Sequence, residues 1–351
     1  MSAESLAPAR HDTLDGIPDP AESVRLFGHS EAVAQVADAY REGRLHHALL
    51  LAGPQGIGKA TFAYHLARHL LAHPEPREAP ASFQPAEAGS ALFRQAASGV
   101  HPSVLHLTRP YNDKTKKFAT LITVDEIRKV AKFLSMRTHD GSYRIVIVDS
   151  ADDMNRNAAN ALLKNLEEPP GRVLFILISH AQGGLLPTIR SRCQTVRMSP
   201  LAEQDMDDAL TAAGIKLPDD PQARERLTAR AGGSARQAIL LAEYGGLELA
   251  EAADRFLGAS RRDPLDAYKL ADAVTGRERE VQFELLNRHI LDRLAAAATA
   301  AAESGDIRRA GRLAAAWDAA SQALATADEY NLDKREHVIG QLNRVAAELG
   351  G

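Results

Sequence analysis

The sequence predicts an α/β domain built on a parallel five-stranded sheet, followed by helical segments to the end of the chain. Three observations predict this fold class. Short β-rich apolar runs alternate with helical stretches in the first half of the chain, which is typical of layered α/β domains. The runs are apolar on both faces, as strands of a helix-covered parallel sheet are. The glycine-rich stretch GPQGIGKA follows the first run directly, and the runs stop after about residue 199.

The elements of the first half follow from these runs and from the stretches between them. Two helical stretches, residues 30–44 and 61–72, flank the first run. Thr123 and Glu126 form a T-x-x-E capping box, which predicts a helix that begins there and ends at about Met136. The five predicted strands are residues 48–52, 104–107, 144–149, 173–179 and 195–198.

Composition divides the chain into four predicted segments. Residues 1–22 are polar and rich in proline, without the apolar centre of a secretory signal, and predict a disordered leader. Residues 23–199 contain the predicted sheet. Residues 200–246 predict a small helical unit, and residues 247–351 are rich in Ala, Leu and Arg with helical periodicity. The last segment contains two expected helix breaks, at residues 258–264 and 304–306.

Composition and charge restrict the class of protein. The 351 residues suffice for two or three domains, and 45% hydrophobic with 25% charged residues is ordinary for a globular chain. The formal net charge of −4 gives no global basic field, so any nucleic-acid contact has to be local. The single cysteine, Cys193, excludes an internal disulfide and a four-cysteine zinc site and fits a reducing compartment. Because no apolar run reaches ~18 residues, we expect no transmembrane helix and a cytoplasmic protein.

The stretch GPQGIGKA, residues 53–60, matches the phosphate-binding pattern G-x-x-x-x-G-K. Its glycines Gly53, Gly56 and Gly58 allow backbone N–H groups to turn inward around a phosphate, and Lys59 reaches the β- and γ-phosphates. The helix that follows adds the favourable field of its N-terminus. A glycine-rich turn that binds nothing is the alternative. The predicted strand before the loop and the helix after it favour a nucleotide-binding P-loop.

One position of the loop departs from the working pattern. Ala60 stands where a Ser or Thr hydroxyl ordinarily binds Mg²⁺. Thr61 carries a hydroxyl, but the next position on a helix is turned by about 100° and is unsuited to replace it. A second signal, RIVIVDSADDMN, ends a predicted strand on Asp149, the usual metal-side carboxylate of such folds. The nearby Asp152 and Asp153 are predicted to cap the next helix.

Three further segments carry family signals: NALLKNLEEPP at residues 160–170, FILIS at 175–179 and TIRSRC at 188–193. Together with the P-loop and the acidic strand, they resemble the AAA+ clamp-loader family of bacterial DNA polymerase III. The resemblance extends from about residue 26 to residue 193 and implies a P-loop AAA+ domain. It also implies that residues 200–246 form a small helical lid domain. Residues 247–351 would form an all-α collar domain through which subunits assemble.

The resemblance implies roles for individual residues at the nucleotide. Lys59 is the phosphate lysine, Asp149 is the metal-side acidic residue, and Ser179 is the first sensor, a polar group near the γ-phosphate. Arg236, in the segment GSAR at residues 233–236, resembles the second sensor, and a surface arginine on a helix is the alternative. The predicted nucleotide-site residues are Gly53, Gly56, Gly58, Lys59, Ala60, Thr61, Asp149, Ser179 and Arg236.

The S-R-C motif at Ser191, Arg192 and Cys193 implies an arginine finger. In the family this arginine reaches the ATP of the neighbouring subunit. A guanidinium suits the task because it is always charged and can stabilise transition-state charge. The chain's own hydrolysis is expected to be weak or absent. Hydrolysing AAA+ relatives carry Glu where this sequence has Ser150, and Ala60 lacks the metal ligand.

The resemblance implies a non-motor subunit of the replicative clamp loader, which supplies Arg192 in trans and helps to load the sliding clamp on primed DNA during DNA replication. The implied partners are motor subunits of the gamma/tau type, a delta subunit, the clamp and primer-template DNA, in a hetero-pentamer without membrane contact. ATP or ADP is expected to bind without efficient hydrolysis. Any DNA polymerase activity (nucleotidyltransferase) would belong to the holoenzyme. The alternatives are an active AAA+ ATPase, either a motor subunit or a DNA-repair remodeller, and a nucleotide-binding scaffold. In the active ATPase, Thr61 and Asp152 would rescue metal binding and water activation.

Zinc is not expected. Many clamp-loader subunits carry a four-cysteine zinc module in the region of residues 73–101, which here contains no cysteine. The start of that region, residues 73–89, is rich in Pro, Ala and Glu and predicts a loop.

DNA contact is expected at the start of the capped helix. The N–H groups at a helix N-terminus attract phosphate, which makes Thr123 a candidate. Lys114, Lys116 and Lys117 precede it in a predicted exposed loop, residues 111–117. A solvated loop without a ligand is the alternative.

Overall fold

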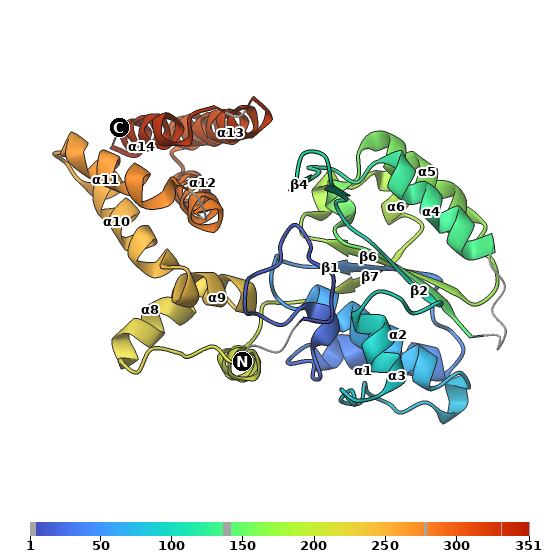
Figure 1. Ribbon diagram of the computed structural model, residues 1–351. Coiled ribbons are helices and arrows are strands. Elements are labelled where there is room, and N and C mark those ends of the chain that lie inside the picture. Colours follow the sequence, from blue (N-terminus) through green and yellow to red (C-terminus); the bar gives the residue numbers. More distant parts are fainter. Residues whose placement is uncertain (1–4, 136–141, 277–278, 331, 351) are drawn as a thin grey trace. The chain divides into compact units, whose positions relative to one another are not determined.

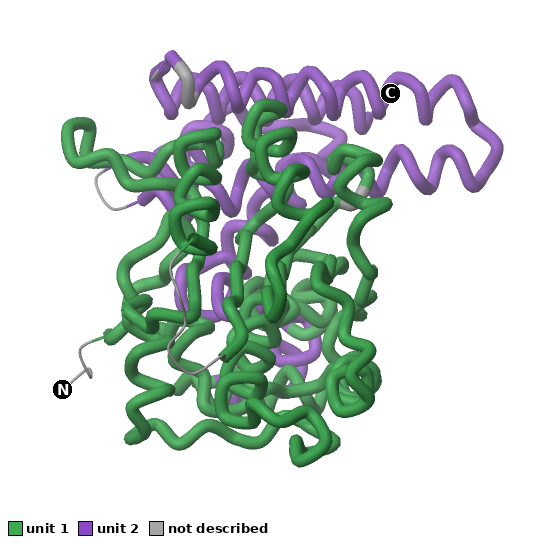
Figure 2. Tube along the Cα trace, turned by 90° about the vertical axis from the view of Figure 1, so that its right-hand side faces the viewer, with its two compact units in different colours: residues 1–216, 228–237 green, residues 217–227, 238–351 purple. Residues whose placement is uncertain are grey.

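The structure, a computed structural model, describes residues 5–135, 142–276, 279–330 and 332–350 (Figure 1). The chain forms two compact units (Figure 2). Unit 1 consists of Met1–Lys216 and Thr228–Gln237, and unit 2 consists of Leu217–Leu227 and Ala238–Gly351. The predicted lid, residues 200–246, contributes to both units, and the domain boundaries at residues 199 and 246 stay predictions.

Unit 1 is built on a parallel five-stranded sheet, which confirms the predicted fold class. Every residue of the two strands that contain Leu50 and Leu177 is buried, and these two leucines are paired in register at the centre of the sheet. Burial on both faces is what the doubly apolar runs indicate. In order across the sheet the strands are β2 (Val104–Leu107), β5 (Arg144–Val148), β6 (Val173–Ser179), β1 (Ala48–Ala52) and β7 (Gln194–Arg197).

Helices cover both faces of this sheet (Figure 1). Successive side chains of a strand point to opposite faces. Leu49 therefore packs in one core with Phe62, and Leu50 packs in the other core with Leu162. The first core lies under α1 (Ser30–Arg41), α2 (Lys59–Ala72) and α3 (Ala91–Ala97), and the second lies under α4 (Val124–Ser135), α5 (Arg156–Glu167) and α6 (Pro187–Arg190).

A small antiparallel hairpin stands where an exposed loop was expected at residues 111–117. In it, β3 (Tyr111–Asn112) pairs with β4 (Lys117–Phe118). Helix α4 begins directly after Thr123, which confirms the predicted start of the capped helix. Its predicted end near Met136 lies outside the described residues.

Residues 5–22 are ordered, which corrects the prediction of a disordered leader over residues 1–22 for this described part. Residues 5–22, called the strap below, pack against the rest of unit 1, and the first four residues of the chain lie outside the described part. Ala21 is fully buried and Arg10 is 8% exposed. The strap ends in the short helix η1 (Pro20–Glu22), which is closed by a reciprocal capping box. These buried contacts stabilise an order that a polar composition does not predict.

Unit 2 is all-α in its described residues, and its core includes Phe256, Phe283 and Leu342. The two predicted helix breaks, residues 258–264 and 304–306, are confirmed. Its main helices are α10 (Gly246–Gly258), α11 (Pro264–Val274), α12 (Glu280–Glu303), α13 (Ile307–Glu329) and α14 (Lys334–Gly350). Helix α7 (Glu203–Ala212) belongs to unit 1, and both units receive residues from α8 (Pro221–Ala231) and α9 (Ala235–Glu243).

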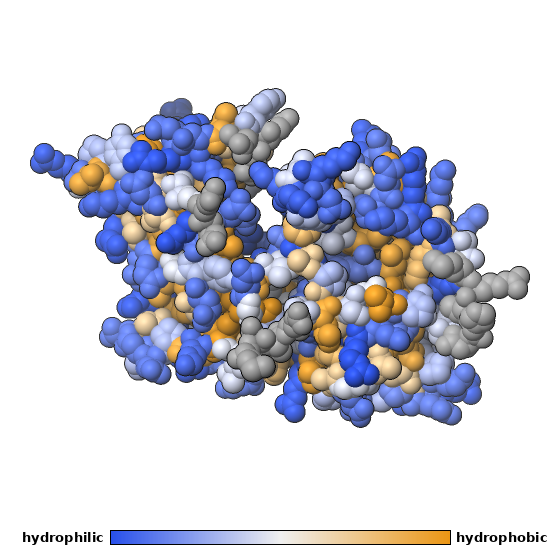
Figure 3. Space-filling model, in the orientation of Figure 1, coloured by the Kyte–Doolittle hydropathy of each residue, from blue (hydrophilic) through white to orange (hydrophobic). Residues whose placement is uncertain are grey.

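The face drawn in Figure 3 is mostly hydrophilic, with apolar side chains scattered between charged ones. In the described part of the chain, no helix combines the length and the apolar character needed to span a membrane.

Candidate functional site

The predicted P-loop joins β1 to α2, and its glycines are required by its backbone and by its close neighbours. Gly56 and Gly58 have φ angles of 78° and 101°, which L side chains rarely adopt. A Cβ atom at Gly53 would collide with the carbonyl oxygen of Met198. The loop therefore has the conformation and the position, before a helix N-terminus, that phosphate binding requires.

The side chain of Lys59 is folded back onto the loop. Lys59 is 3% exposed, and its Nζ donates hydrogen bonds to the carbonyl oxygens of Gly53, at 2.6 Å, and of Pro54. Burial lowers the pKa of Lys59 to about 8, against the opposing charges of Asp149 and Asp152. The ammonium group is thus bound to carbonyl oxygens of its own loop, within the electrostatic influence of the two carboxylates.

The residues after Lys59 supply no metal ligand in the expected place. Ala60 packs at the edge of the first core, and Thr61 is half-buried on the first turn of α2. The loop therefore fits a phosphate group but not the hydroxyl–Mg²⁺ contact of a hydrolysing P-loop.

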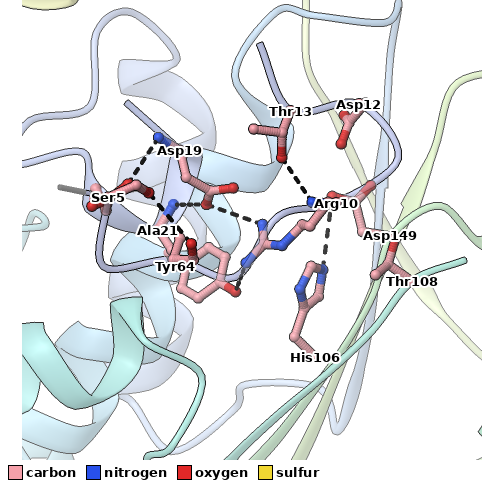
Figure 4. Close-up of polar contacts among 12 residues, drawn as sticks. Ser5, Arg10, Asp12, Thr13, Asp19, Ala21, Tyr64, His106, Thr108 and Asp149 are labelled. Atoms are coloured by element: carbon pink, nitrogen blue, oxygen red, sulfur yellow. Dashed lines mark hydrogen bonds and ion pairs between the residues drawn. The ribbon is translucent and has the colours of Figure 1, made fainter. Parts of the chain in front are cut away.

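Asp149 follows the end of β5, and its side chain is 20% exposed. Burial raises the pKa of Asp149 to about 7, and the charge of Asp12 adds to this shift, while Arg10 and Lys59 oppose it. The Nε2 atom of His106 lies 3.9 Å from its Oδ2 atom (Figure 4). Burial and the charge of Asp12 thus favour the neutral carboxyl group, whereas a cation bound there would favour the carboxylate.

Asp152 and Asp153 have partners that the sequence did not reveal. The predicted capping role is wrong for both, because Asn155 caps α5 by accepting a hydrogen bond from the N–H of Ala158 at 2.8 Å. Asp152 instead accepts two hydrogen bonds. Its Oδ1 atom accepts from the hydroxyl of Ser179 at 2.9 Å, and its Oδ2 atom accepts from the backbone N–H of His180 at 2.6 Å. Asp153 pairs with Arg109 in bidentate fashion, at 2.7 and 2.8 Å. The acidic cluster thus ties the end of β6 to the end of β5.

The segment at residues 233–236 lies against the P-loop. The Ser234 hydroxyl donates to the carbonyl oxygen of Gln55 at 3.0 Å. The backbone N–H of Arg236 donates to the carbonyl oxygen of Gly56 at 3.2 Å. The Nη1 atom of Arg236 donates to the carbonyl oxygen of Asp12 at 2.6 Å. Arg236 is therefore a partly buried member of the P-loop surroundings and not a solvated arginine on a helix surface.

The strap brings its own charged side chains to this region (Figure 4). Arg10 forms an ion pair with Asp19 at 3.0 Å, and the side chains of both residues are 7% exposed. Arg10 also donates a hydrogen bond to the hydroxyl of Tyr64 at 2.8 Å. His11 shares a hydrogen bond of 3.3 Å with Thr108, directly after β2. The strap thus contacts both the residue that follows β2 and, through Asp12, Arg236 beside the P-loop. Sequence reasoning missed it, although its D-x-x-E capping pattern at residues 19–22 was a usable signal.

The S-R-C residues lie at the end of α6. The Arg192 side chain is 36% exposed, forms an ion pair with Glu167 at 2.6 Å, and donates to the carbonyl oxygen of Thr188 at 3.0 Å. Ser191 donates to the same carbonyl oxygen at 3.1 Å. Cys193 packs beside the second core, and burial raises the pKa of its thiol to about 12. The cysteine is therefore an inert packing residue, whereas the arginine is presented at the surface.

Of the DNA-contact candidates, the three lysines are exposed and Thr123 is half-buried, and two acidic residues lie in the first turn of the helix. Lys114, Lys116 and Lys117 lie on the hairpin that precedes Thr123. The first turn of α4 carries Asp125 and Glu126, which pair with basic residues three positions on. Their negative charge opposes a phosphate at this N-terminus.

Within the described ranges, no group of three or more His, Cys, Asp or Glu residues could hold a metal ion.

Comparisons with known proteins show what this chain is similar to. A family model described as "DNA polymerase III, delta subunit" matches residues 28–202, about half of the chain. The chain is 39% identical over 194 residues to DNA polymerase III subunit delta' of Pseudomonas aeruginosa, covering 54% of this chain and 53% of that relative. It is 34% identical over 167 residues to DNA polymerase III subunit delta' of Escherichia coli, covering 47% of this chain and 46% of that relative. The chain thus spans about half the length of these curated relatives. Among solved structures, a DNA polymerase III gamma subunit-related protein from Thermotoga maritima aligns with 91% of this chain and 99% of its own, at 18% identity and a TM-score of 0.42.

Proposed function

Through residues 28–202 this chain belongs to the family of DNA polymerase III delta subunits, and from that premise we propose that it is a delta'-type, non-motor subunit of a bacterial clamp loader. In this role it supplies an arginine finger in trans to a neighbouring ATPase subunit. It thereby helps to load the sliding clamp on primed DNA during replication.

The observation that carries the proposal is a contrast between two parts of unit 1. Arg192 presents a guanidinium at the surface, where a neighbouring subunit can meet it. The chain's own P-loop has Ala60 in place of the Mg²⁺ ligand, and Ser150 provides no carboxylate for activating water. A subunit with an accessible finger and an incomplete site of its own serves the nucleotide of another chain.

The proposed cofactor is ATP or ADP, bound without efficient hydrolysis. The P-loop amides and Lys59 would hold the phosphates, and Arg236 would reach them once it leaves Asp12. Asp149 would be the carboxylate on the metal side, and a bound cation would favour its charged form against the effect of burial. No zinc is proposed.

The proposed partners are motor subunits of the gamma/tau type, a delta subunit, the sliding clamp and primer-template DNA, in a cytoplasmic hetero-pentamer. The helices of unit 2 from α10 to α14 would form the collar. The lysine-bearing hairpin would contact DNA through the assembled ring, with salt-dependent strength.

The test is a reconstituted ring that contains Arg192→Ala. We expect the ring to assemble normally while its DNA-stimulated ATP hydrolysis falls by about tenfold or more, because the finger stabilises transition-state charge. Arg190→Ala, at the exposed end of the same helix, is the matched control and should leave hydrolysis unchanged. Full stimulated hydrolysis by the Arg192→Ala ring would overturn the finger assignment.

The second candidate, an active AAA+ ATPase, is favoured by one observation, the carboxylate of Asp152 beside Ser179. Both oxygens of that carboxylate already accept hydrogen bonds, which does not suit a water-activating base. Purified chain with Mg-ATP should therefore show no turnover above background. Robust turnover that Lys59→Ala abolishes would establish the second candidate instead.

A further inference from the structure

We propose that Glu167 is a positioning residue for Arg192. The carboxylate of Glu167 holds the guanidinium of Arg192 until phosphate oxygens of the neighbouring subunit's nucleotide replace that carboxylate. The inference rests on the proposed function, because it presumes that Arg192 acts in trans.

The guanidinium of Arg192 is held by oxygens of its own chain. Its Nη2 atom lies 2.6 Å from Oε1 of Glu167, and its Nη1 atom donates to the carbonyl oxygen of Thr188 at 3.0 Å and to the hydroxyl of Ser191 at 3.5 Å. The first partner is an anion on a different helix, while the other two belong to the arginine's own turn. Exchange of the carboxylate for a phosphate would therefore leave the arginine tethered to Thr188.

The position of Glu167 is fixed by the fold. It is the last residue of α5, and the prolines at residues 169 and 170 prevent the helix from continuing. The preceding residue, Leu166, is buried, and its carbonyl oxygen accepts a hydrogen bond from Nε2 of His47 at 3.0 Å. Leu166 and Ile189 share one core, so the two helices that carry the pair are held together beneath it.

Helix stability does not explain a carboxylate at this position. The last turn of a helix has exposed carbonyl oxygens and the negative end of the helix dipole, which disfavour the charge of Glu167. Arg192 compensates that charge. The ion pair with Arg192 thus offsets a charge that the helix end disfavours.

The pair is accessible enough to be exchanged. The side chains of Arg192 and Glu167 are 36% and 48% exposed, and ion pairs of this kind contribute little to stability. An arginine is always charged and binds carboxylate and phosphate with the same planar fork. The carboxylate thus competes with the incoming phosphate and is absent from the engaged state.

The competition has a measurable consequence in the reconstituted clamp loader. Replacing Glu167 by Gln keeps the side-chain size but removes the competing charge. The amount of this chain needed for half-maximal stimulation of ring ATPase should fall by up to about fivefold, which corresponds to about 1 kcal/mol. The maximal rate should not change, because the pair is already broken when the finger is engaged.

The experiment titrates wild-type chain, Glu167→Gln, Glu168→Gln and Arg192→Ala into the other subunits with clamp and primed DNA, at low and high salt. Glu168→Gln, one residue further along and also exposed, should match the wild type. The difference between Glu167→Gln and wild type should shrink at high salt, because salt screens exposed charges. A merely structural effect of the substitution would persist at high salt.

The outcomes separate the two proposals. If Arg192→Ala stimulates like the wild type, the finger assignment fails and Glu167 has nothing to position. If Arg192→Ala is inactive but Glu167→Gln has the same half-saturation as the wild type, only the present inference fails. A lower maximal rate with unchanged half-saturation also contradicts it, because Glu167 would then act in the engaged state.

Discussion

Arg236 donates a hydrogen bond through Nη1 to the carbonyl oxygen of Asp12 at 2.6 Å, and the same Nη1 atom lies 4.0 Å from Oδ2 of Asp12. A residue next to the P-loop is thus bound by the N-terminal strap. The charge of Asp12 also contributes to the raised pKa of Asp149. The strap therefore adds negative charge where a nucleotide would bring its phosphates.

Replacing Asp12 by Ala should strengthen nucleotide binding. The substitution removes a negative charge near the phosphate site but leaves the strap's buried anchor, Arg10, in place. We expect the dissociation constant for a fluorescent ATP analogue to fall by up to about fivefold, the range of a partly exposed charge interaction. Asp113→Ala, on the exposed hairpin, is the control. Equal affinities for Asp12→Ala and Asp113→Ala would show that the strap does not hinder the site.

A Cβ atom at Gly56 should separate the P-loop from the segment that carries Arg236. Both Gly56 and Gly16 have positive φ angles, of 78° and 76°, so Ala at either position pays a similar backbone cost of about 1–2 kcal/mol. A Cβ at Gly16 meets open space, whereas one at Gly56 lies 2.6 Å from Cβ of Arg236 and still closer to the hydroxyl of Ser234. Urea unfolding should therefore show Gly56→Ala to be less stable than Gly16→Ala by about 1–3 kcal/mol. Equal losses of stability in Gly56→Ala and Gly16→Ala would mean that the side chains of Arg236 and Ser234 move away from the new Cβ atom at no cost.

The sheet was predictable because the apolar pattern that indicates each strand lies within that strand's own residues. The strands at residues 104–107 and 173–179 match the predicted bounds, since runs that are apolar on both faces have few other places in a fold. The start of α4 was predictable as well, because the T-x-x-E pattern that begins at Thr123 lies within one turn of the chain.

The unpredicted parts of the site depend on contacts between distant residues. The composition of the strap predicts disorder, but Arg10 donates a hydrogen bond to Tyr64 and forms an ion pair with Asp19. No local sequence pattern reveals the contact between Arg10 and Tyr64. Asp152 looks like a helix cap from its spacing, yet it binds the hydroxyl of Ser179, 27 residues away. Such partners are set by tertiary packing, which single-sequence patterns do not encode.

Lys59 should make stability depend on pH in the alkaline range. Burial lowers its pKa from 10.5 to about 8, so between these values the unfolded chain binds the proton and the folded chain does not. The charged lysine therefore opposes folding below pH 8, and this cost disappears as pH rises from 8 to 10.5. Lys59→Met removes the charge, and its stability relative to wild type should fall by on the order of 2–3 kcal/mol across this window.

The measurement is urea unfolding of wild type and Lys59→Met at pH 7, 8, 9 and 10. Lys164→Met, at an exposed position of α5, should follow the wild type at every pH. A pH-independent difference between Lys59→Met and wild type would mean that the ammonium group is well solvated in the folded chain.

Asp149 should produce the opposite dependence at lower pH. Its pKa is raised from 3.8 to about 7, chiefly by burial, so between these values the folded chain holds a proton that the unfolded chain has lost. The stability that comes from the neutral carboxyl is complete below pH 4 and is lost as pH rises through 7. Asp149→Asn stays neutral, so its advantage over wild type should grow by on the order of 2 kcal/mol from pH 5 to pH 8. Asp113→Asn is the exposed control, and urea unfolding at pH 5, 6, 7 and 8 is the measurement. An advantage that stays constant over this range would place the Asp149 pKa near its ordinary value.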